Sequence, residues 1–136
     1  MFDFESKPSF FLMVPCFACG FYAVNMWSLS TGLMDGLLPL MFGTAPEAIP
    51  LLTGPAGKVI WFSNAFSQTG LCYAFHPSTG MNSKKVFTTF LIVQLPWLPL
   101  LYYMFATGLM GMTGIAMFGS FAGTVTALSV YSYTKL

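Results

Sequence analysis

Four polar side chains recur every fourth residue in NAFSQTGLCYAFHP, residues 64–77, a stretch that is otherwise mostly apolar. These four, called the polar row below, are Asn64, Gln68, Cys72 and His76. Positions four apart on an α-helix differ in direction by only about 40°, so the polar row follows one flank of a predicted helix. In a membrane, such a row is typical of hydrogen bonds between neighbouring helices, and this is the interpretation we favour.

The second interpretation of the polar row is ligation of a bound group. Side chains of Asn, Gln and His offer a neutral lone pair, which the magnesium of a chlorophyll or the iron of a haem needs from its axial ligand. Residues of two other apolar segments extend the set, and the candidate cofactor-binding residues are Asn25, Asn64, Gln68, His76 and Gln94. The 15 Phe and 3 Trp residues would supply flat apolar walls for chlorophyll or another pigment. A polar permeation path is a third hypothesis.

The cysteines of CFAC, residues 16–19, have the C-x-x-C spacing of some redox and metal sites. A thioredoxin-like site needs a βαβ context, and attachment of a c-type haem needs a histidine where Gly20 stands. A structural zinc site would need all three cysteines and His76 to converge from different helices. We therefore predict no metal site and interpret these cysteines as apolar helix residues.

Catalytic patterns are sparse in this chain. The predicted membrane spans contain no carboxylate, and the single histidine has no nucleophile and acid at a catalytic spacing. Asp35, Glu47 and Lys58 fall together between the first two spans, where we expect them to pair or to cap helices. An interfacial enzyme that uses these groups with His76 is an alternative, but the prediction is that the protein is not an enzyme.

Small residues repeat with helical spacing in GSFAGTVTALS, residues 119–129. Gly119 and Gly123 form a G-x-x-x-G motif that Ala127 continues, and Ser120 lies in a second small row beside it. Because lipid provides no hydrophobic drive between helices, close backbone approach across small residues is a main source of their association. We predict an interface at Gly119, Ser120, Gly123 and Ala127 and leave open whether its partner is another helix, another copy or another subunit.

The composition of the chain indicates that these residues are carried by membrane helices. Of 136 residues, 56% are hydrophobic and only 7% are charged, whereas a soluble domain carries about a quarter charged residues. The bilayer is the solvent that accepts such a chain. A net charge of +1, with no arginine and no basic run, argues against nucleic acid as a partner.

Hydrophobic segments predict an all-α integral membrane protein with a single membrane domain, residues 1–136, and about four transmembrane helices. The predicted spans are residues 9–33, 59–75, 86–105 and 112–133, with a tight turn at residues 106–111. Pro96 and Pro99 are expected to kink the third span. Residues 36–57 contain four prolines and one carboxylate, so we predict an interfacial loop there, with a re-entrant segment or a fifth crossing as the alternative.

Four crossings would place both termini on one side of the membrane. That side would hold four lysines against Lys58 alone on the other, and the four are Lys7, Lys84, Lys85 and Lys135. The positive-inside rule then directs both termini to the cytoplasm or its organellar equivalent. We expect an organellar membrane, either the thylakoid or the inner mitochondrial membrane.

The functional expectation is a non-catalytic accessory or structural subunit of a larger membrane complex. The favoured setting is an energy-converting complex, photosynthetic or respiratory, in which the chain binds pigment or lipid. The expected partners are lipids and other membrane subunits that contact the fourth helix, with no soluble substrate. The alternative is a small self-associating channel or carrier, with Asn64 and Gln68 lining its pore.

Overall fold

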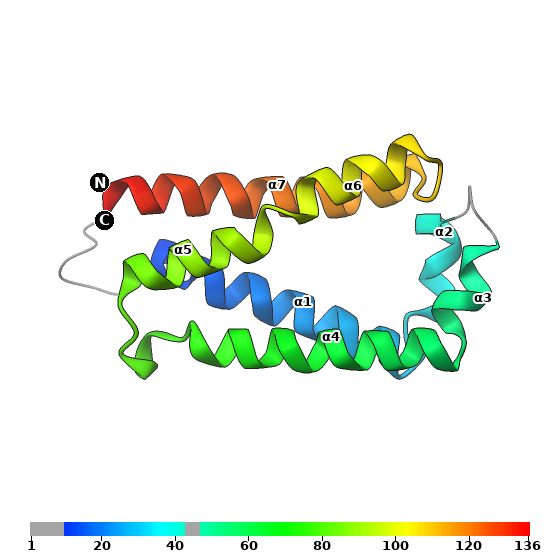
Figure 1. The fold of residues 1–136 in the computed structure, drawn as a ribbon, viewed down its shortest axis with the longest axis horizontal. Helices are drawn as coiled ribbons and strands as arrows, with labels where there is room; N and C mark the ends of the chain where they lie inside the picture. The colour runs from blue at the N-terminus through cyan, green and yellow to red at the C-terminus, as the bar shows by residue number, and fades with distance from the viewer. Residues whose placement is uncertain (1–9, 43–46) are drawn as a thin grey trace.

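The computed structural model describes residues 10–42 and 47–136, and every regular element in them is a helix (Figure 1). The elements in chain order are η1 (Phe10–Met13), α1 (Val14–Ser30), η2 (Asp35–Leu37), α2 (Leu38–Phe42), α3 (Ala48–Thr53), α4 (Pro55–Ala74), η3 (Pro77–Thr79), α5 (Ser83–Gln94), α6 (Trp97–Ala106) and α7 (Met112–Lys135). The all-α prediction is therefore confirmed for the described residues.

The long helices lie side by side along the molecule, with α1 between α4 and the group formed by α5, α6 and α7 (Figure 1). The short helices α2 and α3 close one end of this bundle. At the other end, the ring centroids of Phe11 and Tyr131 are 6.1 Å apart. The first described helix therefore starts at the end of the bundle where the last helix ends.

Three helical segments of the described chain are long and apolar enough to cross a membrane, which is compatible with an integral membrane protein. They are Phe11–Ser30, Ser83–Ala106 and Met112–Lys135. Helix α4 has 20 residues and packs along α1, but it is more polar than these three. The span predicted at residues 59–75 starts earlier, at Pro55, because a proline fits the first turn of a helix, where its missing N–H costs nothing.

The region predicted as an interfacial loop, residues 36–57, contains short helices in its described part. Pro39, Pro50 and Pro55 lie in the first turns of α2, α3 and α4, where a proline does not interrupt helical hydrogen bonds. The described part of this region is therefore largely helical, and its place at the membrane interface stays a prediction. Pro46 lies outside the described residues.

Helix α2 packs into the end of the bundle. Leu38 and Met41 are buried, and the backbone N–H of Gly111 donates to the carbonyl oxygen of Met41 at 3.0 Å. A Cβ atom on Gly114 would lie only 2.8 Å from the same carbonyl oxygen. The glycine at this position therefore lets α2 approach the start of α7.

The other predicted spans agree closely with the observed helices. The first, residues 9–33, corresponds to η1 and α1 from Phe10 to Ser30, and its first residue lies outside the described residues. The third is divided into α5 and α6 at Pro96, as expected for a proline that cannot donate to the helix. The turn before α7 contains Gly108 with a φ of +76°, a conformation that suits glycine.

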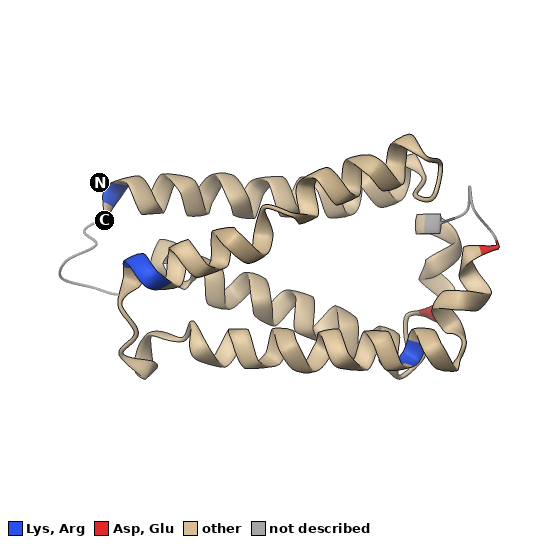
Figure 2. Ribbon diagram, in the orientation of Figure 1, with Lys and Arg blue, Asp and Glu red and all other residues tan. Residues whose placement is uncertain are grey.

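Charged side chains gather at the two ends of the bundle (Figure 2). Lys84 and Lys85 lie in the first turn of α5, and Lys135 is the last residue of α7. These three lysines therefore lie at the end of the bundle that holds the C-terminus. Lys58 lies in the first turn of α4, at the opposite end. Lys7 lies outside the described residues.

Candidate functional site

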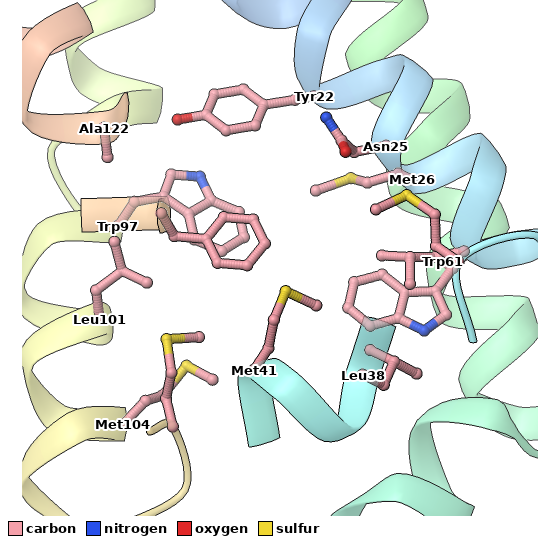
Figure 3. Close-up of a pocket in the computed structure, with 14 residues that line it drawn as sticks. Tyr22, Asn25, Met26, Leu38, Met41, Trp61, Trp97, Leu101, Met104 and Ala122 are labelled. Atoms are coloured by element: carbon pink, nitrogen blue, oxygen red, sulfur yellow. The ribbon is translucent and has the colours of Figure 1, made fainter. Parts of the chain in front are cut away.

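An apolar cavity of about 110 Å³ lies within the bundle, between residues of α1, α2, α4, α6 and α7 (Figure 3). Five of its 14 lining residues are methionines, namely Met26, Met34, Met41, Met104 and Met110. Methionine side chains are flexible and polarisable, so they adapt to guests of different shape. Trp61 and Trp97 add flat aromatic walls. This cavity is the candidate ligand site with the most apolar walls.

The cavity wall is almost entirely apolar, and its Tyr22 is hydrogen-bonded to α5. Nε2 of Gln94, from α5, donates to Oη of Tyr22 at 3.1 Å, which leaves the hydroxyl hydrogen of Tyr22 available to another acceptor. The indole N–H groups of Trp27 and Trp61 donate to Thr69 and Leu52, whereas that of Trp97 has no hydrogen-bond partner among the described residues. Figure 3 shows the ring nitrogen of Trp97 turned toward Tyr22.

Two of the five candidate ligands lie at or behind the cavity. Asn25 lines it directly, and one N–H of its Nδ2 donates to the carbonyl oxygen of Phe21 at 2.8 Å. Gln94 is only 1% exposed and acts through Tyr22 rather than by lining the cavity. The Gln94–Tyr22 hydrogen bond joins α5 to α1, which is the interhelical role favoured for polar side chains in lipid.

The polar row of α4 lies away from the cavity. Gln68 is buried, with no hydrogen-bond partner for its Oε1 in the described structure, and Asn64 is half-buried. The Sγ atoms of Cys72 and Cys16 are 3.8 Å apart, so this flank of α4 faces α1. Ligation by Asn64 or Gln68 remains a prediction.

His76, the last member of the polar row, is exposed at the end of α4. Its Nδ1 lies 2.7 Å from Oγ of Ser78 and accepts the backbone N–H of Ser78 at 3.2 Å. The imidazole therefore caps η3 and orders the connection to α5. A second cavity of about 100 Å³ lies beside it, with Phe75 and Phe87 in its wall.

Cys16 of α1 contacts Cys72 of α4 across the interface between the two helices, and both thiols are free. Sγ of Cys16 lies 3.3 Å from the carbonyl oxygen of Cys72, while Cys19 is buried one turn further along α1. In the part of the chain that the structure describes, no group of three His, Cys, Asp or Glu side chains is placed to hold a metal ion. The C-x-x-C spacing of CFAC thus contributes to α1 packing.

The four small residues of the predicted interface lie on the side of α7 that is turned away from the bundle. The buried residues of α7 are Gly114, Ala122, Val125, Thr126, Ser129 and Ser132. The predicted interface, called the outer face of α7 below, consists of Gly119, Ser120, Gly123 and Ala127. At about 100° per residue, its centre lies roughly 150° around the helix from the buried set.

The space above the outer face of α7 is open. A Cβ atom on Gly123 would meet nothing within 4 Å, and one on Gly119 would meet only the side chain of Ile115 from its own helix. Ser120 and Ala127 are exposed. None of the four residues is therefore packed against another described helix.

The charged groups between α1 and α4 are engaged with each other. Nζ of Lys58 lies 2.5 Å from Oδ1 of Asp35 and donates to the carbonyl oxygen of Leu29 at 2.8 Å. The lysine thus neutralises the carboxylate and caps the C-terminal end of α1, as we expected for this group of residues. Glu47 is exposed at the start of α3.

Sequence reasoning missed the cavity because its walls come from distant segments. Met26, Met41, Trp61 and Trp97 are ordinary apolar residues for a membrane helix, and their spacing indicates no shared site. The abundance of methionine, 10 of 136 residues, was the only available signal. It does not reveal which methionines converge.

Comparison with known proteins identifies no relative, because no family model, curated protein or solved structure matches this chain. The cavity and the outer face of α7 are therefore the features from which a function can be inferred.

Proposed function

We propose that this protein is a non-catalytic membrane subunit that packs against another membrane protein through the outer face of α7. The observation that carries this proposal is the open space above Gly123, on the side of α7 that its own bundle does not use. A glycine in mid-helix costs about 0.5–1 kcal/mol relative to alanine. Two such residues one turn apart are expected where another backbone must come close.

The proposal includes four crossings of the membrane. The 20 residues of α4 span about 30 Å at ~1.5 Å per residue, which matches the hydrocarbon core. Helix α4 also packs along α1, which is long and apolar enough to cross. A polar flank that faces α1 explains how α4 crosses despite its lower hydropathy.

Four crossings would put both termini on the lysine-rich side. We propose that this side faces the cytoplasm or its organellar equivalent, in agreement with the positive-inside rule. The membrane we propose is that of an energy-converting organelle, thylakoid or inner mitochondrial. The support for it is the aromatic content of the chain and the presence of Asn25, one of the candidate ligands, in the wall of the cavity.

The cavity favours lipid over chlorophyll as a bound molecule. An apolar cavity of about 150 Å³ takes up one benzene molecule, and the cavity here measures about 110 Å³. It offers room for one small ring or a short stretch of chain, but not for a chlorophyll macrocycle.

The test is incorporation of a double variant, Gly119→Leu with Gly123→Leu, in the native membrane. We expect the wild-type protein to migrate on a native gel in mild detergent within a particle far heavier than 14.9 kDa. The leucine side chains should prevent close approach and release the chain from that particle.

The matched control is Gly70→Leu, because Gly70 is an exposed helical glycine of α4 whose Cβ would also meet nothing within 4 Å. This variant should stay in the heavy particle. Retention of the double variant would show that the outer face of α7 contacts lipid and would contradict the proposal, and so would equal release by Gly70→Leu.

A further inference from the structure

We propose that the cavity lined by Met26, Met41 and Met104 binds an unsaturated stretch of a lipid chain, meaning a hydrocarbon segment that carries a double bond. This inference deepens the lipid binding in the proposed function and rests on it, whereas it is independent of the outer face of α7. It comes from the apolar walls of the cavity, from its size and partial opening, and from the methionines that converge on it.

The walls of the cavity disfavour a polar group. Their surface is almost entirely apolar. Nε2 of Gln94 donates to Oη of Tyr22, and one N–H of Asn25 donates to the backbone of its own helix. The indole N–H of Trp61 donates to a carbonyl oxygen of α3. A headgroup placed here would lose its hydrogen bonds to water and gain few in return, which is costly. The guest that fits these walls is therefore a hydrocarbon.

The size of the cavity limits how much hydrocarbon enters. Its volume of about 110 Å³ is somewhat smaller than the ~150 Å³ site that accommodates benzene, so it holds one ring or a short stretch of chain. The cavity is partly open rather than sealed. A lipid can therefore insert a short stretch of one chain while the rest of the molecule stays in the bilayer.

Methionines from three helices converge on this space. Figure 3 shows Met26 of α1, Met41 of α2 and Met104 of α6 around the cavity, with Trp61 and Trp97 also in its wall. A thioether is polarisable and makes favourable contacts with π-electrons, as in sulfur–aromatic pairs. A saturated guest would gain only ordinary dispersion contacts from the same atoms. The walls therefore favour a double bond over a saturated stretch of the same length.

The first experiment uses the full chain in detergent micelles and two rings of similar size, benzene and cyclohexane. NMR spectra would follow the methionine methyl resonances during titration with each probe, with partition into empty micelles subtracted. We expect both probes to give saturable shifts at Met104 and Met110, which line the cavity, and none at the exposed Met112. Benzene should bind at least about threefold more tightly, within the range expected for a sulfur–aromatic contact.

A pair of matched variants tests the sulfur atoms. Met26→Leu with Met41→Leu keeps the volume of the wall and removes two sulfurs, so benzene should lose most of its advantage while cyclohexane affinity stays unchanged. The control, Met112→Leu with Met117→Leu, changes two exposed methionines of α7 that lie outside the cavity. The control variant should preserve the advantage of benzene.

The second experiment tests whether the guest is a lipid chain. An octadecene with a central cis double bond and octadecane have the same length and differ only in that bond. Each would be added to the protein with benzene bound. The octadecene should displace benzene at a concentration at least about threefold lower than octadecane does.

The possible failures are distinguishable. Absence of saturable shifts with both rings would overturn the inference together with the lipid binding on which it rests, but not the packing of α7. Equal affinity for the two rings, or an undiminished benzene advantage in Met26→Leu with Met41→Leu, would overturn the preference for a double bond and leave lipid binding in place. Selection of benzene without displacement by the octadecene would show that the site takes a small ring and would overturn the assignment to a lipid chain.

Discussion

Two surfaces of this protein are built from small residues, and only one of them is covered. Between α1 and α4, Ala65 is completely buried, and a Cβ atom on Gly20 would lie 3.3 Å from Sγ of Cys72. On the outer face of α7, a Cβ atom on Gly123 would meet nothing within 4 Å. The same kind of sequence therefore closes one interface within the chain and leaves another open.

The difference shows what a small-residue motif can and cannot specify. In lipid, such residues let backbones approach and gain van der Waals contact, whichever helix provides the second surface. At the α1–α4 interface the second surface is in the same chain, so the contact contributes to folding. At the outer face of α7 it must come from another molecule, so the contact would contribute to assembly.

The largest effect on folding is expected from Gly20→Leu. The added side chain would collide with Cys72 and force α1 and α4 apart, which should lower the free energy of unfolding by about 1–3 kcal/mol, the usual cost of overpacking. Unfolding of the purified chain in mixed micelles with increasing SDS would measure this loss.

The matched variant Gly123→Leu should leave the stability of the isolated chain within about 0.5 kcal/mol of wild type, because its side chain enters open space. The comparison would be contradicted if both substitutions destabilised the isolated chain equally. It would also be contradicted if Gly20→Leu had no effect.

A smaller effect separates two glutamines that are both buried. Gln94→Leu removes the hydrogen bond to Tyr22 and should cost about 0.6 kcal/mol, the average for interhelical hydrogen bonds in a membrane protein. Gln68→Leu should be neutral or stabilising, because Oε1 of Gln68 is buried with no partner in the described structure.

The same SDS unfolding assay measures both glutamine variants. A larger loss for Gln68→Leu than for Gln94→Leu would contradict this comparison, because it would show that Gln68 stabilises the isolated chain more than the Gln94–Tyr22 hydrogen bond does.

Much of the fold could be predicted from the sequence because membrane helices depend on local properties. Apolar length located the helices around α1, α5–α6 and α7, and Pro96 and Gly108 marked a break and a turn. The prolines of residues 36–57 did not show where the short helices begin, because a proline in a first turn permits a helix and a proline in its interior disrupts one. Composition alone does not distinguish these positions.

The candidate site was less predictable because it depends on contacts between distant segments. Asn25 and Gln94 were selected as polar residues in apolar helices, but their relation through Tyr22 requires the packing of α1 against α5. Trp97 was not selected at all, since an indole in a membrane helix is ordinary. The direction of Gly123, inward or outward, likewise depends on which side of α7 the other helices occupy.

The most direct test of the central claim is site-specific photocrosslinking in the native membrane. A small diazirine amino acid would replace Val130, which is exposed and lies in line with the outer face of α7, or the exposed Val59 of α4. We predict a protein adduct from position 130 and only lipid adducts from position 59. Lipid adducts alone from position 130 would contradict the account and show that α7, like α4, faces the bilayer.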